Sequence, residues 1–293
     1  MTAAVAASDD APETRPARTR LPARTRLPAR VGGQLTATSG LGLGVSLLWF
    51  SLLVLIPVAA VLAKTSTGGW GGFWDTITES QTRSALRLTI TQAFLVTLLN
   101  VFMGTLIAWV LVRDQFFGKR ALEVVIDIPF ALPTIVAGLV LLSLYGPKSP
   151  IGVNVANTQR SVFLALAFVS LPFVVRTVQP VLEELDLDVE EAAASLGASR
   201  FTIFRRIILP SLLPAISAGA ALSFARGISE YGSLVLLSGN LANRTEVASV
   251  RILTYIENDD LAAASSVATV LLLISFIVIV LLDVVQRLAV RRG

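Results

Sequence analysis

Three long stretches without a charged residue restrict what this chain can fold into. Residues 41–63, 88–112 and 261–282 are uncharged and mainly apolar. A helix needs about 20 apolar residues to cross the roughly 30 Å hydrocarbon core of a bilayer, and each stretch reaches that length. Only 15% of the 293 residues are charged, against roughly 25% in soluble domains. The sequence therefore predicts a multi-pass membrane protein.

Three further stretches are long enough to span a bilayer but carry charges or prolines within them. They are 121–145 with Glu123, Asp127, Pro129 and Pro133, 161–181 with Arg176, and 212–237 with Pro214, Arg226 and Glu230. Such interruptions are tolerated where other helices or a cavity satisfy them, so these segments are expected to face the protein interior. The result is an all-α fold with spans at about 41–63, 86–112, 121–145, 161–181, 211–237 and 261–283.

Six spans place both termini on one side of the membrane, and the basic residues indicate which side. Sixteen Lys and Arg residues lie on the side of the termini and seven on the other. The seven are Lys64, Arg83, Arg87, Lys148, Arg160, Arg244 and Arg251. Because positive residues are retained inside, both termini and the loop at 182–210 are predicted to be cytoplasmic.

The first 40 residues form a segment separate from the six-span domain at 41–293. They contain the repeat "ARTRLPARTRLPAR", and six arginines lie between Arg15 and Arg30. Proline and charge repulsion oppose a packed core, so a disordered basic cytoplasmic tail is predicted. Two interpretations remain: attraction to anionic lipid head groups, or a solvated tail that only assists orientation.

The residue inventory excludes many functions. The chain has no cysteine and no histidine, which removes disulfides, Cys/His metal sites and thiol or histidine catalysis. Its basic residues flank apolar runs, as membrane topology requires, and do not predict nucleic-acid binding. "FGKR" at 117–120 lacks the upstream glycine and the hydroxyl residue of a P-loop. We therefore expect no catalytic or metal site, although an integral-membrane enzyme using Asp127 or Glu230 remains an alternative.

The cytoplasmic loop carries a helical pattern. Apolar residues recur at spacings of three and four, at Leu182, Leu185, Val189, Ala193 and Leu196, which predicts one amphipathic helix with its acids near the N-terminus. A glycine at position 197 can adopt positive φ and turn the chain into a second short helix. The loop is either a simple connection or a docking element that inserts into a groove of a cytosolic partner.

Charges inside the spans are costly and normally functional or mutually neutralising. Arg226 and Glu230 are four residues apart, so they share a helical face and can pair. The pair either fixes helix packing, or Arg226 attracts a dianion while Glu230 tunes it. Asp127 is interpreted as an interfacial anchor or helix-start acid, and Gln92 and Asn100 as hydrogen-bonding contacts between helices.

The stretch "EAAASLGASRFTIFRRIILP" resembles the EAA loop of ABC-importer permeases. The matching positions are Glu191, Ala192, Ala193, Gly197, Ile207, Leu209 and Pro210. The resemblance implies that residues 182–199 hold a coupling helix that sits in a cleft of a separate ATP-hydrolysing subunit. The residues it assigns to coupling are Glu190, Glu191, Ala192, Ala193, Ala194, Leu196, Gly197 and Ala198.

The resemblance extends from Leu41 onward to the T-type permease of sulfate/thiosulfate ABC importers. It includes "IDIPFALPTIVAGLVLLSLYG" at 126–146 and "LSFARGISEYGSLVLLSGN" at 222–240. It implies a type I importer fold in the bacterial inner membrane, working by alternating access. The implied partners are a W-type permease, two ATP-binding subunits that hold ATP and magnesium, and an extracytoplasmic sulfate-binding protein. No cofactor is implied on this chain.

Two alternatives concern the substrate and the energy source. Molybdate permeases usually carry G-E-F-G-A where this chain has "SEYGS" at 229–233, and Ser229 departs from the sulfate pattern too. A permease for molybdate or tungstate therefore stays open, and Arg226, Ser229, Glu230 and Tyr231 are expected to belong to the pathway or to a structural ion pair. An ion-coupled secondary transporter would predict inverted repeats, which we do not detect.

Overall fold

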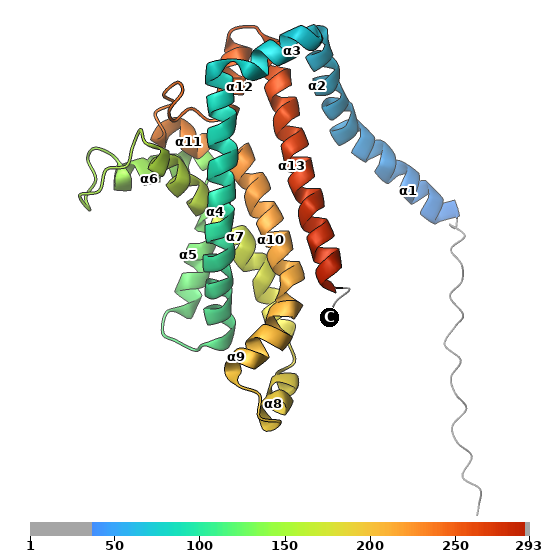
Figure 1. Ribbon diagram of the computed structural model, residues 1–293, viewed down its shortest axis with the longest axis vertical. Helices are drawn as coiled ribbons and strands as arrows, with labels where there is room; N and C mark the ends of the chain where they lie inside the picture. Colours follow the sequence, from blue (N-terminus) through green and yellow to red (C-terminus); the bar gives the residue numbers. More distant parts are fainter. Residues whose placement is uncertain (1–36, 291–293) are drawn as a thin grey trace, which may run out of the picture. The chain divides into compact units, whose positions relative to one another are not determined.

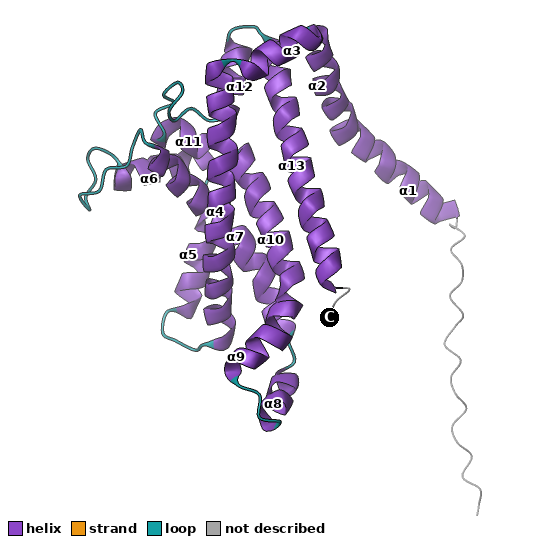
Figure 2. Ribbon diagram, viewed as in Figure 1, coloured by secondary structure: helices purple, strands orange, loops and turns teal. Residues whose placement is uncertain are grey.

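The computed structural model describes residues 37–290, and the regular elements within this range are all helical (Figure 2). The basic tail predicted for residues 1–40 lies almost entirely outside the described residues. The chain divides into two units, residues 1–53 and 54–293. The first unit contributes α1 (Ala37–Phe50), whose large apolar side chains such as Leu41 and Trp49 are exposed.

Five described helices are long and apolar enough to cross a membrane, and a sixth span results if one bent helix pair is counted. The five are residues Ser39–Thr67, Ser80–Arg113, Gln159–Glu184, Arg200–Ser229 and Leu261–Val284. The bent pair is α5 (Lys119–Ala131) with α6 (Thr134–Tyr145), which meet at 118°. The predicted all-α membrane fold is confirmed, but the predicted third span at 121–145 is not a straight helix.

Three helices form the centre of the second unit: α4 (Ser80–Arg113), α7 (Gln159–Glu184) and α10 (Leu209–Ser229) (Figure 1). Glycines let them approach closely, as small residues do in membrane helix pairs. A Cβ on Gly104 would lie 2.8 Å from the Val174 Cβ, and one on Gly219 would lie 2.3 Å from the Thr177 Oγ1. Around this centre, α13 (Leu261–Val290) packs against α10 and α2 (Ile56–Thr67).

The polar residues predicted to join helices have different outcomes. Asn100 Nδ2 donates to Ser170 Oγ at 2.8 Å and to Ser223 Oγ at 3.3 Å. Asn100 therefore connects α4 to both α7 and α10, and its predicted role is confirmed. Gln92 is also buried, but its Oε1 has no hydrogen-bond partner among the described residues. The predicted interhelical contact of Gln92 is absent from this part of the chain.

Two predicted spans are broken at about the same region of the bundle. α5 and α6 are separated by Leu132 and Pro133, and α10 is followed by the short α11 (Gly232–Leu237). α6 and α11 pack together because glycines remove the side chains between them. A Cβ on Gly138 would lie 2.7 Å from the Ser233 carbonyl oxygen, and one on Gly232 would lie 2.1 Å from Thr134 Oγ1.

The two ends of the second unit have different elements. At one end lie α8 (Leu187–Ser195) and α9 (Arg200–Ile203), which continues through a π-helical turn at Phe204–Ile208 into α10. At the opposite end lie α3 (Gly69–Thr78) and α12 (Ala248–Glu257) (Figure 1). Candidate functional sites lie at each of these two ends and at the α10–α11 break.

Candidate coupling loop and charged sites

The loop before α8 corrects one prediction. α7 ends at Glu184, and Leu185 is extended, with φ −66° and ψ 122°. Asp186 then caps α8, because its side chain accepts a hydrogen bond from Asp188 N at 3.0 Å. The single amphipathic helix predicted from Leu182 to Leu196 is therefore wrong. Its apolar spacing is divided between two helices because an aspartate side chain competes with the helical backbone pattern.

The turn after α8 has the predicted geometry. Gly197 has φ +86°, its N donates to Ala194 O at 2.9 Å, and Ala198 N donates to Ala193 O at 3.1 Å. These two bonds form a Schellman motif, which satisfies carbonyls at the helix end and requires a left-handed residue. Ser199 then caps α9 by accepting from Thr202 N at 3.2 Å. The predicted helix, glycine turn and second short helix are confirmed.

The surface of this loop, which we call the coupling loop (residues 187–203), divides into an inner and an outer side. Ala193 and Ala198 are half-buried and pack against the core beneath. Leu196 and Phe201 are 89% and 69% exposed, although both are large apolar residues. Four other residues that the resemblance assigns to coupling are also exposed: Glu191, Ala192, Ala194 and Gly197. The outer side of the loop thus leaves two large apolar side chains uncovered.

The two adjacent acids of the loop have different surroundings. Glu190 forms a hydrogen-bonded ion pair with Arg113 in the last turn of α4, and the two side chains are 21% and 17% exposed. The Arg113 guanidinium also lies 5.5 Å from the centre of the Trp109 ring. Glu191 is exposed. Glu190 therefore ties α8 to α4, a contact that sequence analysis missed because its partner is 77 positions away.

The pair predicted inside the membrane is present. Arg226 Nη2 lies 2.6 Å from Glu230 Oε2, and the Glu230 side chain is fully buried. Glu230 Oε1 accepts hydrogen bonds from both the N and the Oγ of Ser233, each at 2.8 Å. The acid thus caps α11 while pairing with α10. The other two residues predicted here differ in exposure: Ser229 is exposed and donates its hydroxyl to the Arg226 carbonyl, while Tyr231 is 36% exposed.

A second ion pair changes the interpretation of Asp127. Arg176 Nε donates to Asp127 Oδ1 at 2.8 Å, and Arg176 Nη2 donates to Oδ2, so the contact is bidentate. Asp127 lies well inside α5, which begins at Lys119. Its prediction as a helix-start acid is wrong, because Asp127 instead connects α5 to α7 through Arg176. The alternative, an interfacial anchor, stays a prediction. The two charges in adjacent predicted spans neutralise each other.

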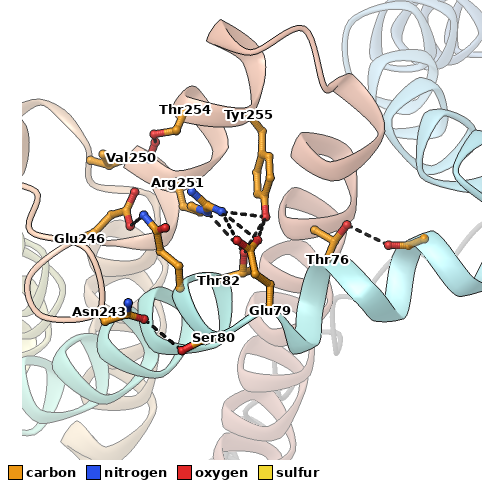
Figure 3. Close-up of polar contacts among 12 residues, drawn as sticks. Thr76, Glu79, Ser80, Thr82, Asn243, Glu246, Val250, Arg251, Thr254 and Tyr255 are labelled. Atoms are coloured by element: carbon orange, nitrogen blue, oxygen red, sulfur yellow. Dashed lines mark hydrogen bonds and ion pairs between the residues drawn. The ribbon is translucent and has the colours of Figure 1, made fainter.

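A hydrogen-bonded network at the opposite end was not predicted (Figure 3). Arg251 Nη2 lies 2.8 Å from both carboxylate oxygens of Glu79. Tyr255 OH donates to Glu79 Oε2 and lies 2.7 Å from Thr82 Oγ1. The hydrogen bond from Tyr255 and the neighbouring Arg251 lower the pKa of the Glu79 carboxyl despite its partial burial. Burial, followed by the bond to Glu79, raises the pKa of Tyr255.

Comparison with known proteins identifies the family. Residues 100–292 match the family described as "Binding-protein-dependent transport system inner membrane component". The chain is 42% identical over 259 residues to "Sulfate transport system permease protein CysT" of Salmonella typhimurium, a match that covers 86% of this chain and 94% of that protein. The chain belongs to the CysT permease family. The permease is also 42% identical over 250 residues to the CysT protein of Synechocystis, covering 83% of this chain and 87% of that protein.

Solved structures with a similar fold are more distant in sequence. The permease matches a chain of a bacterial alginate ABC transporter with a TM-score of 0.70 and 15% identity, over 85% of this chain and 93% of that one. It matches a chain of the MetNI methionine ABC transporter with a TM-score of 0.51 and 16% identity, over 70% and 96%. These likenesses concern the fold, and they confirm the predicted ABC-importer permease architecture.

Proposed function

We propose that the chain is the membrane-spanning subunit of an ATP-driven importer that carries sulfate or thiosulfate into the cytosol by alternating access. The observation that carries this proposal is the identity of 42% with a sulfate transport permease over 86% of the chain. The glycine turn between α8 and α9 supports it further, because Gly197 holds the conformation that the EAA-like pattern requires.

The coupling loop would receive the motion of the ATPase. Its outer side presents Leu196 and Phe201 to a partner, and its inner side is joined to two central helices. The Arg113–Glu190 pair links it to α4, and the turn at Phe204–Ile208 continues directly into α10. A displacement of α8 and α9 would therefore move α4 and α10 relative to α7, which is a packed-helix shift of the kind that switches access.

The translocation pathway would pass the α10–α11 break. The Arg226 side chain is 27% exposed, so part of it stays accessible while the buried Glu230 neutralises its charge. Ser229 and Tyr231 flank the break on its accessible side. An arginine that is paired but not enclosed attracts a dianion without trapping it, which suits a conduit better than a storage site.

The assembly that we propose contains four kinds of subunit. This chain would pair with a W-type permease, and both would rest on two ATP-binding subunits that hold ATP and magnesium, so that this chain carries no cofactor itself. An extracytoplasmic sulfate-binding protein would deliver the anion. The proposed location is the bacterial inner membrane, with both termini and the coupling loop in the cytoplasm, as the distribution of basic residues favours.

Uptake of radiolabelled sulfate tests the proposal. The chain is expressed with its neighbouring transporter subunits in cells that lack their own sulfate permeases. Uptake that requires the ATPase and is blocked by excess thiosulfate is the expected result. If only molybdate or tungstate were taken up, and this uptake required the ATPase, the proposed substrate would be wrong but the proposed mechanism would stand. Uptake without any ATPase would contradict the proposal and favour an ion-coupled transporter.

A further inference from the structure

Five of the basic residues that depart from the positive-inside pattern lie near one another in the chain's second unit. Arg83 and Arg87 are on the first turns of α4, and Arg160 is on the first turn of α7. Arg244 is in the loop before α12, and Arg251 is on α12 itself. The start of α4 and helix α12 lie at the end opposite α8 (Figure 1), and Gln159 at the start of α7 bonds to Arg244 in the loop before α12. Arg251 is neutralised by Glu79. Arg87 and Arg244 have no carboxylate within ion-pair distance among the described residues.

These two unpaired arginines line the same cavity. The cavity has a volume of about 320 Å³, and its polar lining includes Arg87, Arg244, Ser84, Thr91, Gln92 and Gln159. Among the described residues that line it, none is acidic. The nearest acid in sequence to Arg244 is Glu246, which is buried and accepts a hydrogen bond from Gln81 Nε2 at 2.6 Å. Two cations with only hydroxyl and amide neighbours form an environment for an anion.

Gln92 is a second observation that points to a ligand. Its side chain is nine-tenths buried, and its Oε1 has no partner among the described residues. A buried amide without partners is costly. Its Nε2 donates to no described residue, and because Gln92 lines the cavity, this NH2 group can donate to a bound oxyanion. An oxyanion in the cavity would therefore give the amide nitrogen of Gln92 an acceptor, although it would not pair with Oε1, which is itself an acceptor.

The loop that carries Arg244 is held in shape before any ligand binds. Thr245 Oγ1 donates to Ser238 O at 2.6 Å and accepts from Leu241 N at 3.0 Å. Arg244 N donates to Leu241 O at 3.0 Å, and Gln159 Nε2 donates to Arg244 O at 3.3 Å. The backbone of Arg244 is thus fixed to the first turn of α7. Because the backbone is already fixed, only the Arg244 side chain has to be ordered when an anion binds.

The cavity is lined by the stretch of α4 that also crosses α10 beside the proposed pathway. Gln92 is followed by Ala93, which packs against α10, where a Cβ on Gly227 would lie 3.2 Å from the Ala93 Cβ. Gly227 directly follows Arg226. The inner residue of the cavity is therefore one position from the contact between α4 and the segment that carries the buried ion pair. An anion held in this cavity would lie against the same stretch of α4 that contacts α10 beside Arg226.

We propose that Arg87, Arg244 and Gln92 form a low-affinity receiving site for a tetrahedral oxyanion dianion, where sulfate is held after release from the binding protein and before it reaches Arg226. This inference rests on the proposed function. The volume leaves room for the anion with several waters, since one water occupies about 30 Å³ of liquid. Exposed arginines and residual hydration keep the binding weak, as a transit site requires.

Binding of radiolabelled sulfate to the complete, nucleotide-free transporter in phosphatidylcholine nanodiscs, without binding protein, tests the site. Saturable binding is expected, weakened at least tenfold by Arg87→Gln, by Arg244→Gln and by Gln92→Leu. Arg83→Gln is the matched control, because Arg83 is an exposed arginine on the same helix that does not line the cavity. In uptake assays the first three variants should raise the half-saturating sulfate concentration while the control does not.

The possible outcomes separate this site from the proposed function. A transporter that imports sulfate but binds none in nanodiscs, or binds it equally in all variants, overturns the site and leaves the function intact. A transporter that imports no sulfate overturns the function. Variants that change only the half-saturating concentration of binding protein would show that the arginines contact its acids. Variants that lose binding of added phosphatidylglycerol while their sulfate binding is unchanged would show a lipid head-group site. Each of these last two results also overturns the proposal.

Discussion

The two ends of the helical bundle are held together in different ways. At one end the coupling loop is attached to the helices by the Arg113–Glu190 pair and by two half-buried alanines, and its large apolar side chains are exposed. At the other end, Glu79, Thr82, Arg251 and Tyr255 share a continuous hydrogen-bonded network (Figure 3). One ion pair and apolar packing hold the first end, whereas a network of several hydrogen bonds holds the second.

This contrast suggests that one end of α4 is held more firmly than the other. Helix α4 takes part in both ends, since Arg113 is its last residue and Thr82 lies in its first turn. A movement of α8 would therefore act on a helix whose far end is anchored to α12. Variants at the coupling end should reduce transport with little loss of folding, and variants at the network end should reduce stability first.

The largest effect is expected from Gly197→Val. A β-branched residue at φ +86° is strained by about 1–3 kcal/mol, although nothing lies within 4 Å of the added Cβ. We expect insertion and basal ATPase activity to persist while sulfate uptake is lost. Gly197→Asn is the matched control, because asparagine tolerates the left-handed region, and it should retain most uptake. Normal uptake by the valine variant would contradict the described role of this turn.

The next effect concerns the two neighbouring acids. Glu190→Gln should reduce ATP-dependent uptake about tenfold, because a charge-assisted hydrogen bond contributes about 1.5 kcal/mol and this one ties α8 to α4. Glu191→Gln should have a smaller effect, since that side chain is exposed. Uptake and ATPase rates of both variants, measured at equal protein levels, decide the comparison. Equal losses would mean that the Arg113–Glu190 ion pair does not contribute to transport.

Arg251→Ala tests the fixed end. The substitution leaves Glu79 and Tyr255 without their cation, and we expect a loss of about 1–2 kcal/mol in the free energy of unfolding, a value discounted because the Glu79 side chain is 44% exposed. Thermal unfolding of the purified complex should occur a few degrees lower, while uptake at low temperature is retained. An unchanged melting temperature together with lost uptake would reverse the assignment of the two ends.

The smallest effect is a pH dependence at the same network. Because Tyr255 and Arg251 lower the pKa of Glu79 below its ordinary value of 4.5, its contribution to stability is complete above that value and is lost as the pH falls through the folded-state pKa. Melting temperatures between neutral and acidic pH should show this loss, and Glu79→Gln should be less stable at neutral pH but lose less on acidification. A parallel decline in both proteins would exclude the network as the cause.

Local features were predicted well because they depend only on neighbouring residues. Hydropathy and length located the spans, the glycine at 197 located the left-handed turn, and a spacing of four brought Arg226 and Glu230 together. The interruption at Leu185 was not predicted, because the capping bond of Asp186 competes with an apolar spacing that looked continuous.

The sequence by itself determined a multi-span helical fold and the glycine turn after α8, since hydrophobic length, periodicity and positive φ are properties of short segments. Only the tertiary structure decided which charges meet. Asp127 pairs with Arg176, Glu190 with Arg113, and Glu79 with Arg251, across separations of 49, 77 and 172 positions. Arg87 and Arg244 likewise line one cavity although they lie on different elements. These partnerships depend on the rotation and register of packed helices, which close glycine contacts fix and which no local pattern encodes.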